Sequence, residues 1–199
     1  MSAAFKLMDV RSLLAQLRVE MLLASRRGES VLITLVVPVV LLVFFGAVAP
    51  PGVGGDARPI DFLVPGLLAL AIMSTSMVSL GIATAYERYY GALKRLLGSP
   101  LPRQSLLTAK TLSVLLIEAV QVALLVLIAR LAFGWSPSGS PPLAVLALAL
   151  GSAAFAGLGL LMAGVLRAEA TLAVANGLYL QFLLVGGFVF PIERLPGPL

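Results

Sequence analysis

The chain has 199 residues, of which 60% are hydrophobic and only 12% are charged. Soluble domains carry about 25% charged and about 45–50% apolar residues, and the mean hydropathy here is +1.06. This composition excludes a soluble globular enzyme and a disordered chain. The sequence has no cysteine and no histidine, which excludes a disulfide and removes the commonest general base and metal ligand. The net charge of +5 suits a membrane surface, and no nucleic-acid partner is predicted.

Residues 1–29 are predicted to form an amphipathic helix that lies in the membrane interface. Apolar side chains such as Leu14 and Met21 recur on one face, while polar side chains such as Gln16 and Glu20 recur on the other. The helical pattern extends over residues 5–27. This pattern fits a simple membrane anchor as well as it fits a helix that transmits movement, so both interpretations stay open.

Residues 30–199 are predicted to form an all-α integral membrane domain with five spanning helices. A helix needs about 20 mostly apolar residues to cross a bilayer core of about 30 Å. Apolar stretches with few or no charged residues reach this length five times, at residues 31–49, 62–84, 108–132, 143–165 and 171–190. Pairs of small residues four positions apart in the fourth span predict close helix packing. Packing within one chain is favoured over packing across a dimer. The pairs are Ser152/Ala156, Ala153/Gly157 and Gly159/Ala163.

The basic residues are unevenly divided between the two sides of the predicted spans. Eleven fall on the side of the N-terminus: Lys6, Arg11, Arg18, Arg26, Arg27, Arg88, Lys94, Arg95, Arg103, Lys110 and Arg167. Three fall on the other side: Arg58, Arg130 and Arg194. Because short cytoplasmic loops carry an excess of Lys and Arg, we expect a protein of the cytoplasmic membrane with its N-terminus in the cytoplasm.

The connection between the second and third spans is predicted to contain a short amphipathic helix at residues 86–98. Gly98 falls where a helix C-cap is expected, and Pro100 cannot continue the helix. Such a helix either rests on lipid or fills a groove in a partner protein, and spacing alone does not separate the two. Its apolar stripe is Tyr86, Tyr89, Leu93, Leu96 and Leu97.

This run resembles the cytoplasmic motif of type-2 ABC exporter permeases, the transmembrane subunits of drug and polysaccharide exporters. The matching residues are Glu87-Arg88, Gly91, Lys94-Arg95-Leu96 and Ser99-Pro100, and Phe62-Leu63-Val64-Pro65-Gly66 is similar to the family's entry to its second span. The resemblance implies that Tyr86, Glu87, Arg88, Gly91, Lys94, Arg95, Leu96 and Pro100 form a coupling helix.

The same resemblance implies the partners of the chain. A coupling helix contacts a separate cytoplasmic ABC ATPase, and a second permease copy or a paralogue completes a homo- or heterodimer surrounded by lipid. The 199 residues contain no G-x-x-x-x-G-K-[ST] motif. ATP and magnesium are therefore expected in the partner ATPase, with no cofactor, metal or catalytic residue in this chain.

The end of the chain departs from the family pattern. Family members usually have six spans, with a re-entrant outer hairpin before the sixth. Residues 188–199 are similar to the start of that hairpin, and the sequence ends at Leu199. We therefore expect a truncated gene, a fragment, or a protein that another polypeptide completes.

Glu118 is an ionisable residue about two turns into the third predicted span. A charged side chain at the centre of a spanning helix costs about 2.5–3.5 kcal/mol by insertion scales, so such residues face a bundle interior or a wet cavity. Gln121 lies on the same helix face. Two hypotheses remain open: an interhelical hydrogen bond from a protonated Glu118, or a polar element of a translocation path or proton site. The candidate partners are Ser74, Thr75, Ser76, Ser79, Asn176 and Gln181.

The leading functional hypothesis is the permease subunit of an ATP-driven exporter. The alternative is an ATP-independent, proton-coupled secondary transporter that uses Glu118 as its proton site. The sequence shows no inverted repeats, which are typical of many secondary transporters. A membrane-embedded enzyme is the third hypothesis, and Glu118 would be its only carboxylate at membrane depth.

Overall fold

The computed structural model describes residues 10–26, 28–48, 58–98, 103–137 and 139–185, and every regular element in these ranges is a helix. The all-α prediction is therefore confirmed for the described part of the chain. The helices, in chain order, are α1 (Val10–Arg26), α2 (Gly28–Val48), α3 (Pro59–Met73), the π-helical segment η2 (Ser74–Ser79), α4 (Leu80–Tyr89), α5 (Ala92–Leu97), α6 (Arg103–Phe133), α7 (Pro141–Val165) and α8 (Ala168–Val185).

Three of these stretches are long and apolar enough to cross a membrane. They are Pro59–Tyr89, which joins α3, η2 and α4, then Gln104–Phe133 and Pro141–Val165. They contain the predicted spans 62–84, 108–132 and 143–165. The helix α2 contributes a shorter apolar stretch, Thr34–Ala47, and α8 has 18 residues. The spans predicted at 31–49 and 171–190 are thus helical where the structure describes them, and the count of five spans stays a prediction.

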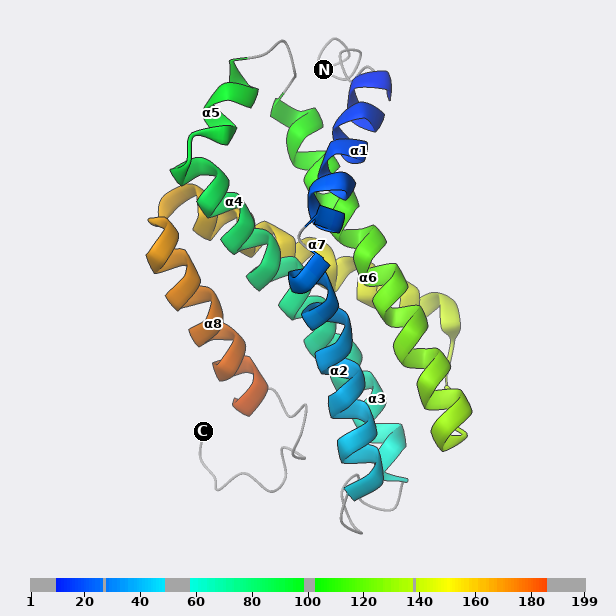
Figure 1. Cartoon of the computed structure of the whole chain (residues 1–199). Helices are drawn as coiled ribbons and strands as arrows, with labels where there is room; N and C mark the ends of the chain where they lie inside the picture. Colours follow the sequence, from blue (N-terminus) through cyan, green and yellow to red (C-terminus); the bar gives the residue numbers. More distant parts are fainter. Residues whose placement is uncertain (1–9, 27, 49–57, 99–102, 138, 186–199) are drawn as a thin grey trace.

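The helix ends fall into two groups at opposite ends of the bundle (Figure 1). One group, which we name the α5 end, contains α1, α5, the start of α6 and the junction of α7 with α8. The C-terminal end of α2, the start of α3 and the C-terminal end of α6 lie at the other end. Arg88, Lys94, Arg95, Lys110 and Arg167 belong by their elements to the α5 end, whereas Arg58 and Arg130 belong to the opposite end.

The centre of the bundle is formed by α3 and η2. The helix α3 contacts α2, α6 and α7, and η2 contacts α6, α7 and α8. Most of their apolar side chains, including Val64, Met73 and Met77, are almost fully buried. The helix α7, in contrast, leaves Leu150 and Leu161 each 62% exposed. Large exposed apolar faces mark contact with a membrane or a protein partner.

The helix α7 packs closely against η2 and α4. A Cβ atom built on Gly159 would lie 2.7 Å from the carbonyl oxygen of Met77, and one on Gly81 would lie 3.1 Å from the carbonyl oxygen of Gly159. Ser152, Ala156, Gly159 and Ala163 are buried. Two of the three predicted small-residue pairs therefore pack within the chain. The third pair, Ala153 and Gly157, lies on the exposed face of α7.

The prediction of one helix over residues 86–98 is wrong. Tyr86, Glu87 and Arg88 continue α4 to Tyr89, and the separate helix α5 has only six residues. The break occurs at Gly91, whose φ of 74° lies in the left-handed region that ends helices. Gly98 follows α5 as its C-cap, as predicted. Pro100 and the hairpin at residues 188–199 lie outside the described residues.

We expect Gly159→Val to lower the thermal unfolding temperature of the purified protein. The added side chain meets backbone atoms of η2, which cannot move aside as a flexible side chain can, and overpacking of this kind costs about 1–3 kcal/mol. The matched control is Gly157→Val, because a Cβ at Gly157 meets nothing within 4 Å. Equal unfolding temperatures for the two variants would show that the close approach does not contribute to stability.

Candidate functional site

Glu118 lies in the middle of α6 and is 3% exposed. Its carboxyl group accepts hydrogen bonds from the hydroxyl of Ser76 in η2 and from the hydroxyl of Ser152 in α7. The sequence predicted Ser76 as a partner but not Ser152, which was noted only as a small packing residue. Glu118 thus bonds α6 to two other helices.

Gln121 follows one turn later on the same face of α6 and is 1% exposed. Its Nε2 donates to the backbone carbonyl oxygen of Thr34 in α2, at 2.7 Å, and its Oε1 lies 3.0 Å from the Oγ1 of Thr75 in η2. We name Glu118, Gln121, Thr75, Ser76 and Ser152 the polar cluster. Together its members bond α6 to α2, η2 and α7.

The π-helical geometry of η2 coincides with the polar cluster. Ser74, Thr75 and Ser76 are consecutive, and Thr75 and Ser76 are buried against α6. Ser74 instead lines a cavity on another side of η2. Single turns of π-helix within α-helices are frequent at functional sites. One short segment therefore contributes both to the cluster and to the cavity.

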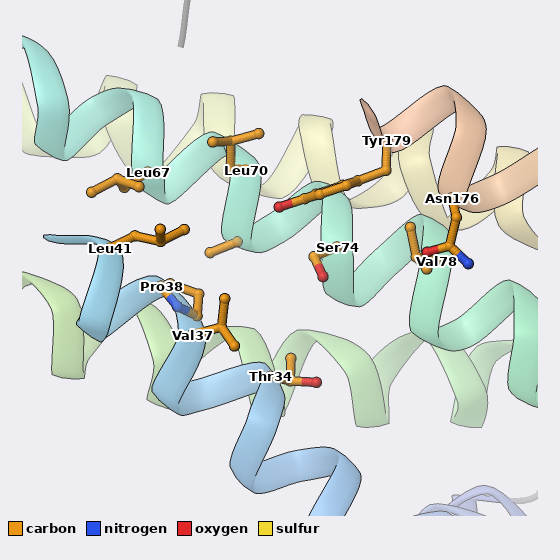
Figure 2. A pocket seen from close by; sticks show the side chains of 11 residues that line it. Thr34, Val37, Pro38, Leu41, Leu67, Leu70, Ser74, Val78, Asn176 and Tyr179 are labelled. Carbon is orange, nitrogen blue, oxygen red and sulfur yellow. The ribbon is translucent and has the colours of Figure 1, made fainter. Parts of the chain in front are cut away.

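The cavity has a volume of about 200 Å³ and lies between α2, α3, η2 and α8 (Figure 2). Apolar side chains such as Leu41 and Leu67 form most of its wall. Figure 2 shows Tyr179 reaching from α8 toward the side of the cavity formed by α3 and η2. Asn176 also lines the cavity and donates to the carbonyl oxygen of Leu172 in its own helix, at 2.8 Å.

The predicted pathway residues are therefore only partly brought together. Glu118, Gln121 and Ser76 meet in the polar cluster, and Asn176 lies at the neighbouring cavity. Gln181 is exposed on α8 and lines neither that cavity nor the cluster. Thr34 and Tyr179 were not singled out from the sequence, because nothing in an apolar run tells which residue faces a cavity.

An ion triad lies at the α5 end of the bundle. The ammonium of Lys110 in α6 lies 3.1 Å from Oε1 of Glu20 in α1 and 2.6 Å from Oε2 of Glu87 in α4. Lys110 is 2% exposed. The helix predicted over residues 5–27 is confirmed from Val10 to Arg26, and its polar face packs on α6 through this triad.

The charged residues of the 86–98 motif therefore have different surroundings. Glu87 belongs to the triad, and Arg88 donates to the carbonyl oxygens of Gly164 and Leu166 at the end of α7. Carbonyls at a helix C-terminus lack partners within the helix, so the guanidinium caps α7. Lys94 and Arg95 in α5 are exposed. Of the four charged residues of the motif, Lys94 and Arg95 are thus the two that belong neither to the triad nor to the cap of α7.

The comparison with known protein families identifies the chain. The model of the family described as "ABC-2 type transporter" matches residues 11–199. The chain belongs to this family. It is thus an ABC transporter permease and a transmembrane transport protein, as its apolar helices indicate. Within the described residues, this permease has no cluster of acidic residues that could hold a metal ion.

Curated relatives agree with the family. The permease is 26% identical over 184 residues to "Putative transport permease YvfS" of Bacillus subtilis, covering 89% of this chain and 73% of that protein. It is 25% identical to "Probable multidrug ABC transporter permease YbhR" of Escherichia coli, over 68% of this chain and 37% of that protein. It is 30% identical to "ABC transporter G family member 20" of Dictyostelium discoideum, over 71% of this chain but only 20% of that protein. No solved structure matches the chain.

We expect Glu118→Gln to fold as the wild type does, whereas Glu118→Leu lowers the free energy of unfolding by about 1–3 kcal/mol. Glutamine keeps an oxygen that accepts from Ser76 or Ser152, while leucine leaves both buried hydroxyls without this acceptor. The measurement is the thermal unfolding temperature in detergent.

The matched control is Glu169→Leu, because Glu169 is an exposed glutamate on α8. This control should leave the unfolding temperature nearly unchanged. Failure of Glu118→Gln to fold would contradict a role based on hydrogen bonding.

Proposed function

We propose that this ABC-2 permease is the membrane subunit of an ATP-driven exporter in the cytoplasmic membrane. A separate cytoplasmic ATPase binds ATP and magnesium, and a second permease copy or a paralogue completes the transmembrane unit. The observation that carries the proposal is the family match over residues 11–199. The concentration of basic residues at the α5 end supports an orientation in which this end and the N-terminus face the cytoplasm.

The ATPase binds at α5. Lys94 and Arg95 are exposed there, and Tyr89 and Tyr90 beside them are 64% and 69% exposed. Tyrosine and arginine are enriched at protein interfaces, where their large side chains contribute much of the binding energy. This combination favours a protein partner over lipid, since the apolar residue Leu93 of α5 is already half-buried.

Movement of the ATPase reaches the membrane through α4. Gly91 joins α5 to α4, and α4 continues without a break into η2. Arg88 and Glu87 bond the end of α4 to α7 and α6, so a displacement of α5 moves this end of the bundle as a unit. Such coupling between two sites acts in both directions, and substrate binding in turn changes the affinity for the ATPase.

The cavity beside η2 is the candidate point of contact with the substrate. Hydroxyl and amide groups of Thr34, Ser74, Asn176 and Tyr179 face an otherwise apolar wall, which suits an amphipathic molecule. Its volume of about 200 Å³ is below the roughly 300–1,000 Å³ of sites for drug-sized ligands. The remainder of the path then comes from the second copy.

We expect the double substitution Lys94→Glu with Arg95→Glu to reduce co-purification of the ATPase by about tenfold while leaving membrane insertion intact. Both side chains are exposed and neither belongs to a spanning helix. Gly91→Val should also uncouple ATP hydrolysis from transport, since a β-branched residue is strained at a φ of 74°.

The control for this experiment is Arg167→Glu, an exposed cation at the α5 end but outside α5. Glu87→Lys is unsuitable, because it removes one of the two carboxylates of the ion triad, leaves two ammonium groups beside Glu20 and so disturbs the bundle itself. Normal ATPase binding and coupling in both the Lys94/Arg95 double variant and Gly91→Val would refute the assignment of α5 as the coupling helix.

The proposed orientation predicts the outcome of cysteine labelling in intact cells. The chain has no native cysteine, so single cysteines give a clean signal. Gly98→Cys at the α5 end should be protected from a membrane-impermeant maleimide, and Ser136→Cys at the opposite end should react. Both positions are exposed, and the φ of −82° at Gly98 accepts a side chain. If Gly98→Cys reacted and Ser136→Cys did not, the topology would be the reverse of the one proposed.

The alternative of a proton-coupled carrier differs in its energy source and in its response to Glu118→Gln. A carrier that uses Glu118 as its proton site would transport without any ATPase and would lose coupled transport when this carboxyl is neutralised. In the exporter, Glu118 holds the polar cluster together, so the same substitution preserves ATP-driven transport. Transport by reconstituted permease with and without its ATPase separates the two.

A further inference from the structure

A second and larger hollow opens at the α5 end of the bundle. It has a volume of about 970 Å³ and lies between α1, α2, η2, α4, α5 and α6. We name it the α1–α4 cleft. Among the described residues, its charged lining residues are Glu20 and Arg26 from α1, Glu87 from α4 and Lys110 from α6. The charges of these two carboxylates and two cations sum to zero.

The charged end of the α1–α4 cleft offers sites for both halves of a zwitterion. Tyr86 and Tyr90 line it with stacked rings whose centroids are 6.1 Å apart, next to the carboxylate of Glu87. Aromatic faces and carboxylates attract an ammonium group. Arg26 is exposed in the last turn of α1, and a guanidinium binds phosphate oxygens in a bidentate manner.

The inner part of the α1–α4 cleft is lined mostly by apolar side chains. They include Leu23, Leu80, Ile82 and Ile117, and the hydroxyl-bearing residues Thr34, Ser74, Thr75, Ser79 and Ser113 also line the cleft. The cleft extends along α4 and η2 from Glu87 to Ser74, 13 positions that correspond to about 20 Å at a helical rise. It shares Thr34, Ser74 and Val78 with the cavity of Figure 2, so the two hollows adjoin. This length along the helix exceeds half of the bilayer's hydrocarbon core of about 30 Å.

We propose that the α1–α4 cleft binds one phospholipid of the inner leaflet with a zwitterionic, amine-bearing headgroup, namely phosphatidylethanolamine. Its phosphate binds Arg26, and one acyl chain follows α4 toward Ser74. Its ammonium donates hydrogen bonds to Glu20 and Glu87 beside the tyrosine pair, because the ion triad sets these two carboxylates against the single positive charge of Lys110. The lipid thereby bridges α1 and α4. The leaflet rests on the orientation proposed above, whereas the binding itself depends on neither the ATPase nor the substrate.

The experiment is native mass spectrometry of the delipidated, purified protein in detergent with equal amounts of phosphatidylethanolamine, phosphatidylcholine and phosphatidylglycerol. We expect one phosphatidylethanolamine to bind about tenfold more tightly than either other lipid. Phosphatidylcholine has no ammonium hydrogen to donate, and phosphatidylglycerol has no ammonium, so each loses charge-assisted hydrogen bonds. Equal binding of the three lipids, or a preference for phosphatidylglycerol, would overturn the proposal.

Substitutions locate the lipid in the cleft. Arg26→Gln should weaken binding of all three lipids by about tenfold, because each carries the phosphate. Glu20→Gln should reduce the preference for phosphatidylethanolamine over phosphatidylcholine. Ala83→Phe, which fills the apolar part, should abolish binding, and Glu169→Gln outside the cleft should change nothing. Unchanged binding in Arg26→Gln and Ala83→Phe would place the lipid elsewhere.

Two further measurements keep the test decisive. If Ala83→Phe does not fold, as judged by gel filtration, Arg26→Gln and Glu20→Gln still decide the outcome. Both are expected to fold, because Arg26 is exposed and because the glutamine in Glu20→Gln keeps an oxygen that accepts from Lys110. Glycerophosphoethanolamine, the headgroup without acyl chains, should not compete. Competition at equal concentration would refute the role of the apolar part. Lipid-binding failure with normal ATPase coupling would leave the exporter function standing.

Discussion

Glu118 and Gln121 lie one turn apart on α6, and between them they bond to α2, η2 and α7. Inside a bilayer no water satisfies a polar group, so each hydroxyl and amide must find its partner within the protein. Thr75 and Ser76, adjacent in η2, reach Gln121 and Glu118 respectively. A slip of η2 against α6 would break these bonds together, which makes the two elements one rigid unit and fixes the orientation of the hydroxyls in η2.

The ion triad imposes a second constraint, at the opposite end of α4 from the polar cluster. Removing Lys110 and its two carboxylates from water is expensive, and buried ion pairs are weak contributors to stability. Their geometry nevertheless fixes the register of α1 and α4 on α6, because the short bonds to Glu20 and Glu87 form in one alignment. With Arg88 bonded to the end of α7, the corner from which α5 projects is held on three sides.

Features that depend on composition could be predicted from the sequence. Features that depend on which neighbour a side chain points toward could not. Apolar runs with few or no charged residues located the long helices, and an acid within an apolar helix identified Glu118 and one of its partners. Ser152 resembles any small residue in an apolar helix, and Thr34 participates through its backbone carbonyl, so no pattern in the sequence distinguishes either. The amphipathic spacing of residues 86–98 continues through Gly91, although a left-handed glycine divides that stretch. The ion pair of Glu87 was not predicted, because Lys110 is 23 positions away in the sequence.

These constraints locate the part of the permease that can change shape. The polar cluster and the Gly81–Gly159 contact hold α6 and α7 to η2, while the cavity separates η2 and α3 from parts of α2 and α8. A packed interface moves only between discrete arrangements, whereas helices facing a cavity have room to approach each other. Ser74 lines both the cavity and the α1–α4 cleft. A displacement of α4 that starts at the α5 end therefore reaches the cavity through η2. Of the helices around the cavity, α8 can then move without breaking a buried hydrogen bond to α6.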